Sequence, residues 1–421
     1  MKKLLKKLFP ICRSITGKGL LKSLKIIKDK NKLIKIKSFK SGTRVFDWKI
    51  PPEWNVKDAY IANEKNERVV DFKKNNLHLI SYSIPIKKKI KVSELMSRIH
   101  SLPKQMNYIP YLTSYYKKYW GFAIKHNLKE KLFKNKKEKF FVNIETKFNR
   151  NGKMHYAECL IKGKSKKEIL ITTYLCHPSM ANNELSGPIV WKYLLEYFKK
   201  KKNRYSLRFV ITPETIGSIS YISKNYKSLK ANIIGGYVLT CLGDKGDFSY
   251  LNSRNENSIS DLVVSRYFDK KNIKYKNYSY LDRGSDERQY NHPKIDLSLG
   301  SIMRTKYGKF SQYHTSGDNL DFVKSKNLKK SFKVCKEIIE EFMKIHIPEN
   351  KISCEPFLTK HNLYPTLSTK KVDKTSKNIL NFLSYSDGKN DLISIAKKIQ
   401  LSLSQTKKIY KILILKRLIK F

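Results

Sequence analysis

Cysteine is sparse in this 421-residue sequence, and its six cysteines stand far apart with no Cys-x-x-Cys pair. That spacing argues against a disulfide framework and against a zinc ribbon, so we expect reduced thiols. Long apolar runs are also lacking, because no window approaches the ~20 apolar residues that a membrane-spanning helix requires. The N-terminal lysine pairs accompany no apolar core of signal-peptide length. These absences predict a soluble, cytoplasmic protein with no membrane partner.

Acidic residues are few: 35 Asp and Glu stand against 88 Lys and Arg, which gives a formal net charge of +53. Only 13 of the basic residues are arginine, and the lysines are spread along the whole chain. Ile, Asn, Tyr and Phe are abundant as well, a bias typical of AT-rich genomes because AT-rich codons encode these residues. We therefore attribute most of the charge to codon bias rather than to a nucleic-acid interface, with weak adhesion to polyanions as its physical consequence.

The length of the chain suggests two or three domains. Between about residues 140 and 345, short apolar runs alternate with helical patterns. The expected strands are 139–145, 168–175, 206–212, 233–241 and 296–301, and the expected helices are 187–201, 217–229, 256–272 and 325–344. This alternation predicts an α/β domain with a mixed sheet flanked by helices.

Residues 43–124 have a different character, with short mixed runs around a Pro51-Pro52 turn. Short strands separated by turns predict a small β-rich domain. Because helical sequence precedes it and α/β sequence follows it, we expect this domain to be an insertion. The α/β domain would then comprise residues 1–42 and 125–350, followed by a linker at 351–374.

The last segment, 375–421, indicates three helices that begin near Ser376, near Asp391 and at Ser402. The turn into a lysine-rich third helix is typical of a winged-helix or helix-turn-helix unit. Apart from Gln405, that helix lacks an array of Arg, Asn and Gln side chains for reading bases. DNA binding through this domain is therefore an alternative that the sequence leaves open but does not favour.

Three polar segments carry candidate chemistry: Leu175-Cys176-His177-Pro178-Ser179, Thr212-Pro213-Glu214-Thr215 and Tyr313-His314-Thr315-Ser316. The first two directly follow expected strands, and ligands of α/β sheets gather at the carboxyl ends of strands. A Glu in this position is suited to act as a general base. Each residue also has an ordinary interpretation: a structural histidine, or a glutamate that interacts with a helix N-terminus.

In this order, His177, the loop 181–187, Glu214 and His314 resemble the zinc aminopeptidases with two co-catalytic metals. The resemblance is closer to a subgroup of aminopeptidase-like proteins that are often linked to surface-polysaccharide biosynthesis genes, and it covers essentially the full chain. The motifs that carry it are Phe9 to Gly17, Phe46 to Trp48, Pro51 to Trp54, Thr113 to Tyr116, Trp120 to Phe122, Cys176 to Ser179, Pro213 to Ser218 and Tyr313 to Ser316. It implies an aminopeptidase fold with a β-rich insertion and a C-terminal winged helix.

The chain departs from the two-metal pattern at three ligand positions. Asn183 stands where the metal-bridging Asp is expected, Thr215 where a second Glu is expected, and Thr240 near the place of a further Asp. A neutral amide is a poor zinc ligand and cannot bridge two cations as a carboxylate does. The resemblance therefore implies at most one zinc ion, held by His177, His314 and Asn183, with Glu184 as a neighbouring carboxylate that could substitute.

Arginine is the scarcer base, so Arg288 and Arg304, which precede His314, are candidates for bidentate recognition of a substrate carboxylate or phosphate. An ordinary structural ion pair is the alternative for both. Asp286 is a further substrate-site candidate, and it could also orient a histidine, because metal-binding imidazoles usually donate their other N–H to a carboxylate.

Together these features predict a zinc-dependent, aminopeptidase-like hydrolase that cleaves an amide of a peptide or an amino-sugar derivative, with Glu214 as proton acceptor. The alternative is a catalytically degenerate ligand-binding or DNA-binding regulator. The sequence leaves open whether the chain forms a homo-oligomer.

Overall fold

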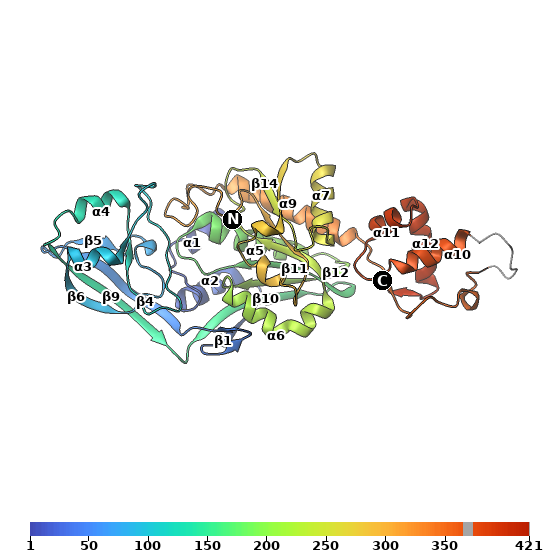
Figure 1. The fold of residues 1–421 in the computed structure, drawn as a ribbon, viewed down its shortest axis with the longest axis horizontal. Coiled ribbons are helices and arrows are strands. Elements are labelled where there is room, and N and C mark those ends of the chain that lie inside the picture. Colours follow the sequence, from blue (N-terminus) through green and yellow to red (C-terminus); the bar gives the residue numbers. More distant parts are fainter. Residues whose placement is uncertain (365–373, 421) are drawn as a thin grey trace.

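The computed structural model describes residues 1–364 and 374–420, and its centre is an eight-stranded mixed sheet (Figure 1). The strands follow the order β1 (Lys35–Lys40), β10 (Lys153–Ile161), β12 (Tyr205–Thr212), β11 (Ser165–Tyr174), β13 (Ile233–Leu239), β16 (Leu299–Met303), β14 (Phe248–Leu251) and β15 (Tyr275–Tyr278). The strands β12, β11, β13 and β16 run parallel to one another. Their carboxyl ends therefore meet at one edge of the sheet.

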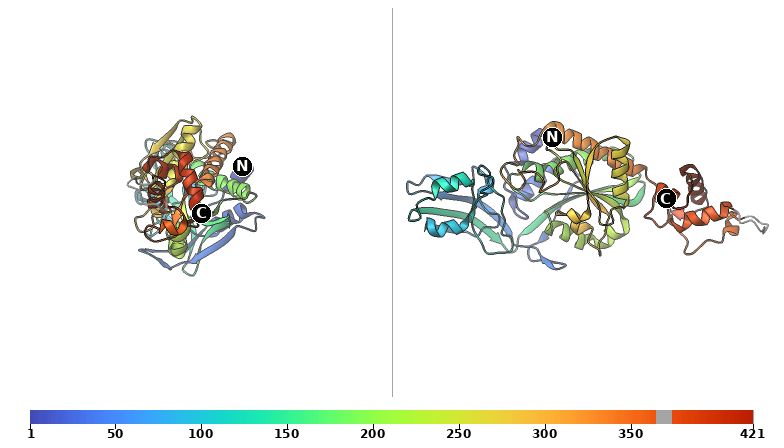
Figure 2. Two further views of the ribbon diagram at one scale, coloured as in Figure 1. Left: turned by 90° about the vertical axis from the view of Figure 1, so that its right-hand side faces the viewer. Right: turned by 45° about the horizontal axis from the view of Figure 1, so that its top comes forward.

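Helices cover both faces of this sheet, as the alternating sequence predicts. One face carries α1 (Lys2–Leu8), α2 (Lys18–Lys28), α5 (Ser186–Phe198), α7 (Ile259–Lys270) and α9 (Ser325–Lys344), and the other carries α6 (Ile216–Asn232) and the short α8 (Glu287–Tyr290). Figure 2 shows the same two layers from the side. The central strand β11 is buried on both faces, which explains its nearly continuous apolar sequence. The predicted α/β class, a mixed sheet flanked by helices, is confirmed.

The β-rich insertion contains a four-stranded antiparallel sheet in the order β5-β4-β9-β6. Its strands are β4 (Glu53–Ala62), β5 (Arg68–Asp71), β6 (Ile86–Lys91) and β9 (Lys139–Asn149). The smaller elements beside it are β2 (Arg44–Val45), β3 (Trp48–Lys49), α3 (Val92–Leu95), β7 (Ile99–His100), β8 (Phe122–Ala123) and α4 (His126–Leu132).

Strand β9 is a correction to the sequence-based prediction, which placed 139–145 in the large sheet. Strand β9 pairs antiparallel with β4 and β6, and its side chains Phe140, Val142 and Ile144 lie in the core of the insertion. The small β unit therefore continues to about residue 149, beyond the predicted boundary at 124. An apolar alternation predicts a strand but does not say which of two sheets it joins.

The C-terminal unit is a winged helix built from α10 (Lys374–Ser384), α11 (Leu392–Lys398), α12 (Leu403–Leu415) and the two-stranded pair β17 (Glu349–Asn350) and β18 (Ile419–Lys420). The helix starts expected near Asp391 and at Ser402 are confirmed, because both side chains cap their helices. Leu358 is buried in the core of this unit, so the predicted linker at 351–374 belongs to it over its first half. The rest of that linker, 365–373, lies outside the described residues.

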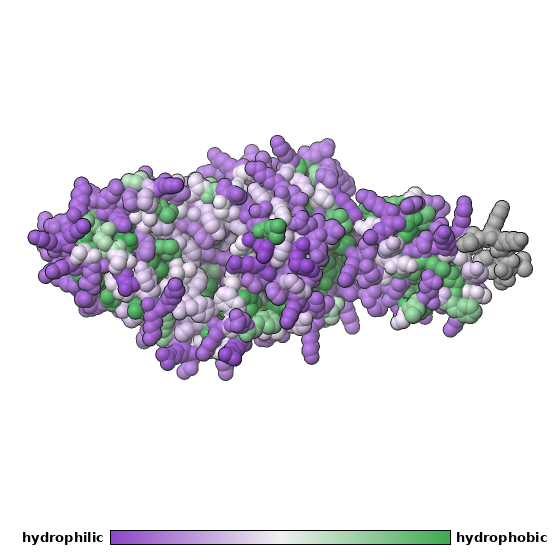
Figure 3. All heavy atoms as spheres, viewed as in Figure 1, coloured by the Kyte–Doolittle hydropathy of each residue, from purple (hydrophilic) through white to green (hydrophobic). Residues whose placement is uncertain are grey.

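The winged helix projects from one end of the elongated molecule, opposite the insertion (Figure 1). An ion pair between Arg266 of α7 and the buried Asp391 anchors it to the α/β domain. Figure 3 shows hydrophilic side chains spread over all three parts of the visible face. Within the described part of the chain, no helix has both the length and the apolar character that crossing a bilayer would require.

Candidate functional site

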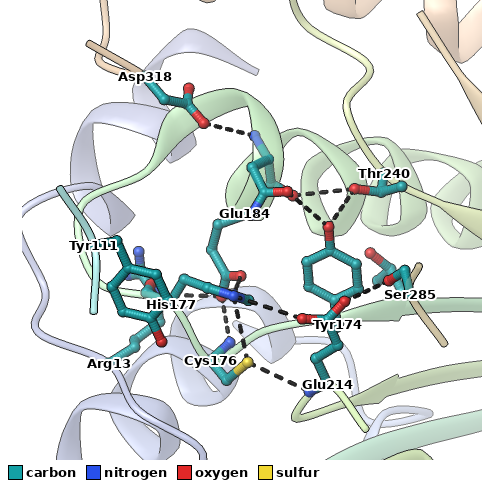
Figure 4. Close-up of polar contacts among 12 residues, drawn as sticks. Arg13, Tyr111, Tyr174, Cys176, His177, Glu184, Glu214, Thr240, Ser285 and Asp318 are labelled. Atoms are coloured by element: carbon teal, nitrogen blue, oxygen red, sulfur yellow. Dashed lines mark hydrogen bonds and ion pairs between the residues drawn. The ribbon is translucent and has the colours of Figure 1, made fainter. Parts of the chain in front are cut away.

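The site lies at the carboxyl ends of β11 and β12, whose last residues Tyr174 and Thr212 are paired in register. His177 follows β11 by three residues and Glu214 follows β12 by two. His177 Nε2 lies 3.6 Å from Glu214 Oε2 (Figure 4). The ring centroids of His177 and His314 are 5.3 Å apart. The structure therefore brings together the three side chains that the sequence singled out.

His177 is held from behind by a buried carboxylate. Its Nδ1 lies 2.6 Å from Oε2 of Glu184, and the other oxygen of Glu184 accepts the backbone N–H of Cys176. Burial by itself lowers the pKa of His177, but the adjoining Cys176 and Glu184 outweigh this effect and raise the pKa well above its ordinary value. The contact leaves Nε2 as the nitrogen that faces Glu214.

His314 belongs to the loop that follows β16, and the insertion holds this loop in place. The backbone N–H of Tyr111 donates to the carbonyl of His314 at 2.8 Å, and the Tyr111 ring packs edge-on against both histidines. Tyr313 stacks on the other side of the His314 ring. Burial, together with the nearby His177, lowers the pKa of His314 to about 3. His314 is therefore a neutral imidazole with a lone pair at physiological pH.

Glu214 is in the position of a proton acceptor. Burial raises its pKa, and this shift is opposed by His177 and by the Ser285 hydroxyl, which donates to Oε1 at 2.5 Å. The following residue, Thr215, has a φ of 62°, so the chain turns sharply between β12 and α6. This turn leaves Glu214 at the sheet edge rather than on the helix, which argues against a purely helix-capping role.

Asn183 lies in a neutral hydrogen-bonded network. Its Oδ1 accepts from the hydroxyl of Tyr174 at 3.0 Å, and that hydroxyl is 2.6 Å from Oγ1 of Thr240. Thr240 in turn donates to the backbone carbonyl of Asn183. No carboxylate takes part in this network, so these residues do not fit a bridging position between two cations.

One ion fits the remaining donors better than two. His177 turns Nε2 toward Glu214, whose Oε2 lies 3.6 Å away, and His314 is neutral. Among the described residues, the one group of His, Cys, Asp and Glu side chains with ligand atoms close enough to share an ion is Cys176, His177 and Glu184. Zinc sites that keep catalytic activity use three protein ligands and one open position. The Nδ2 of Asn183 is buried without a hydrogen-bond partner among the described residues, which marks this loop as incompletely satisfied.

Two of the predicted substrate residues occupy other roles. Asp286 is fully buried and accepts from the backbone N–H of Thr215 and the hydroxyl of Ser218, so it supports the Glu214 turn and orients no histidine. Burial and the charge of Glu214 raise its pKa to about 8. Arg304 is also buried, with its guanidinium over the ring of Phe248. This arrangement directs Arg304 into the protein rather than toward Glu214.

Arg288 remains close to the site. Its side chain is exposed and its Nη2 donates to Oγ1 of Thr215 at 2.8 Å, next to Glu214. An exposed guanidinium beside the proton acceptor can meet an anionic group of a ligand.

Sequence reasoning missed several residues that build the site, namely Arg13, Tyr111, Tyr174, Ser285 and Asp318. Asp318 accepts three backbone N–H groups of the loop 181–183, which fixes the short π-helical turn Ala181–Leu185. A signal was present for two of them: Arg13 lies inside the motif Phe9 to Gly17, and Asp318 follows His314 by four residues. The sequence does not predict which residues Arg13 and Asp318 contact, because these contacts join segments more than 100 residues apart.

Two family models match this chain. Residues 2–344 match the family model described as a domain of unknown function, DUF4910. The chain belongs to this family. Residues 346–421 match a winged helix-turn-helix model. A Clostridium acetobutylicum protein named as a polysaccharide biosynthesis protein with an aminopeptidase-like domain is 41% identical over 400 residues, covering 94% of this chain and 90% of the relative.

Solved structures show the same fold. A Clostridium acetobutylicum crystal structure described as a peptidase is 40% identical, with a TM-score of 0.80, over 100% of this chain and 95% of that one. The zinc aminopeptidase BSAP from Bacillus subtilis has a TM-score of 0.60 at 14% identity, covering 82% of this chain and 94% of its own. At that identity the similarity shows the fold alone. The family resemblance inferred from the sequence motifs is confirmed.

Proposed function

We propose that this DUF4910 protein is an aminopeptidase-like metallohydrolase that cleaves an amide, in a peptide or an amino-sugar derivative, within surface-polysaccharide metabolism. The convergence of His177, His314 and Glu214 at one sheet edge carries the proposal. The aminopeptidase-like fold and the name of the Clostridium relative support the reaction class and the biosynthetic setting.

His177 and His314 would hold a single zinc ion, with Asn183 as a weak third ligand. When bound, the ion polarises the scissile carbonyl and makes a bound water more acidic. Glu214 accepts the proton of the attacking water, and its raised pKa suits this task better than that of an exposed carboxylate. Ser285 keeps Glu214 oriented through the hydrogen bond to Oε1.

Substrate recognition in this proposal falls to the exposed Arg288 at the rim and to the aromatic wall that Tyr111 and Tyr313 form around His314. Such a wall excludes water on one side and leaves room for an apolar or ring-shaped group. A guanidinium opposite it would select ligands with a carboxylate or phosphate.

The test is metal analysis of the full chain purified without added zinc, together with His177→Ala and His314→Ala variants. We expect about one zinc per chain in the wild type and a loss in both variants, with hydrolysis of aminoacyl or N-acyl amino-sugar amides only in the loaded wild type. Wild-type protein that binds no zinc at micromolar free metal would refute the metallohydrolase.

The winged helix fits a packing role better than a DNA-reading one. In helix-turn-helix proteins the first turns of the recognition helix contact base edges. Here Leu403 and Lys407, on the first turns of α12, line a cavity of about 300 Å³ together with residues of α7 and α9. Lys407, Lys408 and Lys411 are all exposed on α12, and Leu403 is 37% exposed. We therefore propose that this domain serves the architecture of the chain and retains nucleic acid only through its charge.

A further inference from the structure

Arg13 has no place in the proposed chemistry, yet it is one of the most deeply buried charged side chains described. It lies between α1 and α2, inside the motif Phe9 to Gly17, and has no solvent-exposed surface. Its Nη1 donates to the carbonyl of Leu8 at 2.6 Å and its Nε donates to the carbonyl of His177 at 3.0 Å. Burying a charged side chain costs folding free energy unless the charge is paired and hydrogen-bonded.

That partner is Glu184, which is also fully buried. Arg13 Nε lies 3.8 Å from Glu184 Oε1, the oxygen that accepts the backbone N–H of Cys176. The second oxygen of Glu184 is the one that contacts His177 Nδ1 at 2.6 Å. Arg13 thus touches the His177 segment twice, directly at its backbone carbonyl and through Glu184 at its ring.

Oε1 of Glu184 accepts the Cys176 N–H and faces Arg13, so Oε2 is placed to accept a hydrogen bond from His177 Nδ1. When His177 loses its second proton, the lone pair then lies on Nε2, on the side of Glu214. The Arg13 guanidinium holds this side chain in place, because its Nε lies 3.8 Å from Glu184 Oε1 and also donates to the backbone carbonyl of His177. The tautomer of His177 is therefore set by a residue near the start of the chain.

We infer that Arg13 and Glu184 are positioning residues that fix the Nδ1–H tautomer and the ring orientation of His177. A carboxylate in this role raises the basicity of a ligand histidine and holds its ring in place. The consequence for zinc binding rests on the proposed function, whereas the tautomer itself does not. The inference also gives Glu184 a role behind the site, in place of the direct ligand role that the sequence left open.

The same atoms allow a competing arrangement. Cys176 Sγ, His177 Nδ1 and a Glu184 oxygen all lie within 4.8 Å of one another, and such a trio could hold a metal. The guanidinium of Arg13 argues against this, because a fixed positive charge 3.8 Å from Glu184 repels a second cation. One Glu184 oxygen is also already occupied by the Cys176 N–H.

The experiment compares wild type, Glu184→Gln, Arg13→Lys and Arg13→Met in the full chain labelled with ¹⁵N-histidine, which gives nine imidazole spin systems. His177→Gln assigns the signal. Imidazole ¹⁵N shifts recorded above the pKa of His177, where the ring is neutral, report which nitrogen carries the proton, and zinc competition titrations report affinity. We expect Nδ1–H in wild type, a mixed or reversed tautomer in Glu184→Gln and Arg13→Met, and partial retention in Arg13→Lys. Zinc affinity should fall by roughly 10- to 100-fold where the tautomer is lost.

The chain offers a matched control in the ion pair between the half-buried Arg208 and the buried Glu168, whose hydrogen-bonded atoms lie 2.5 and 2.9 Å apart. Glu168 lies near the start of β11, whereas His177 follows its end. Glu168→Gln should therefore reduce stability without moving the His177 signal or the zinc affinity. A general loss of stability is thereby separated from loss of positioning.

Several outcomes overturn the inference. An unchanged Nδ1–H signal in Glu184→Gln would show that the carboxylate does not set the tautomer. A loss of zinc in Cys176→Ser, with Arg13→Met binding zinc more tightly, would favour the competing thiolate site. A wild type that binds no zinc, with the tautomer changes intact, would refute the proposed function and leave the positioning roles standing.

Discussion

His177 and Glu214 directly follow two neighbouring parallel strands, and His177 Nε2 lies 3.6 Å from Glu214 Oε2. This distance is long for a direct hydrogen bond and leaves room for a third partner that both groups contact. The strands fix the separation, since Tyr174 and Thr212 are paired in register. The two side chains can therefore have separate roles: His177 can bind a metal ion, and Glu214 can accept a proton.

Replacing Glu214 by Gln tests this division. The amide keeps the size and the Ser285 contact but cannot accept a proton. We expect kcat for amide cleavage to fall roughly 100- to 10,000-fold with little change in KM, the range typical of a lost general base. The measurement is steady-state kinetics on the best amide of a substrate panel.

Ser285→Ala is the control for that variant. It removes the hydrogen bond to Oε1 and leaves the carboxylate in place. Its activity should fall far less than that of Glu214→Gln. Equal losses in both variants would mean that orientation of this segment matters and proton acceptance does not.

Tyr111 gives a second prediction, because it joins the insertion to both histidines. Tyr111→Ala should lower the free energy of unfolding by about 3–5 kcal/mol, as for other large buried aromatic residues, and should weaken metal binding. Tyr111→Phe keeps the ring and loses only the contact between its hydroxyl and Tyr115, so its metal affinity should remain near that of wild type. Thermal unfolding and metal titration of both variants provide the measurement.

Much of this site could be anticipated from the sequence because strand ends are local features. The apolar runs before His177 and Glu214 form β11 and β12 as predicted, and parallel strands bring their ends together without further information. The predicted bounds of the long helices agree with the structure because helical periodicity is also a local feature of the sequence. The predicted helix 325–344 has the same bounds as α9, whose apolar face repeats with helical spacing.

The other features of the fold and the site depend on contacts between distant segments, which no local sequence pattern specifies. The strands β1, β10, β14 and β15 were not predicted. β1 and β15 lie at the two edges of the sheet and carry exposed polar residues, β10 mixes exposed with buried positions, and β14 is buried but has only four residues. Glu184 resembled a substitute metal ligand until its contact with Arg13 was visible. Asp286 and Arg304 looked like surface recognition groups, although both are buried, because composition does not reveal burial.

A prediction on pH dependence follows from Asp286, whose pKa is raised to about 8 by burial and by Glu214. The native carboxyl keeps its proton up to about pH 8, whereas the unfolded chain releases it near pH 4. Between these values the native state binds more protons, so stability falls as pH rises, by at most about 1.4 kcal/mol per pH unit, and levels off above pH 8.

Asp286→Asn should lack this fall, because the amide stays neutral and its oxygen can still accept from Thr215 and Ser218. Because Glu214 and Asp286 influence each other, the difference between the two stability curves reports the titration of Asp286 together with its effect on Glu214. Denaturant unfolding from pH 4 to 9 supplies those curves. Parallel curves would show that Asp286 is ionised in the native protein across the whole range.

Arg266 tests whether the winged helix is a packing module. Arg266→Ala leaves Asp391 buried without its cation and should loosen the attachment of this domain. We expect faster proteolysis around residues 345–350, with metal content and amide cleavage unchanged. DNA retention by the wild type should fall steeply with salt and be the same for unrelated sequences. A marked sequence preference at physiological salt would instead support a regulator.

Asn183→Asp places a carboxylate where the two-metal pattern expects one. Without a cation, this buried charge should destabilise the fold, and with zinc it becomes a ligand. We therefore expect tighter zinc binding than in wild type and a larger rise in unfolding temperature on adding zinc. The stoichiometry should stay at one ion, because Thr215 and Thr240 still supply no carboxylate.

Asn182→Asp is the matched control for Asn183→Asp. Asn182 donates to Asp244, so a second carboxylate there should destabilise the loop with no gain in zinc affinity. Two ions in the wild type, or unchanged affinity in Asn183→Asp, would contradict the single-ion site.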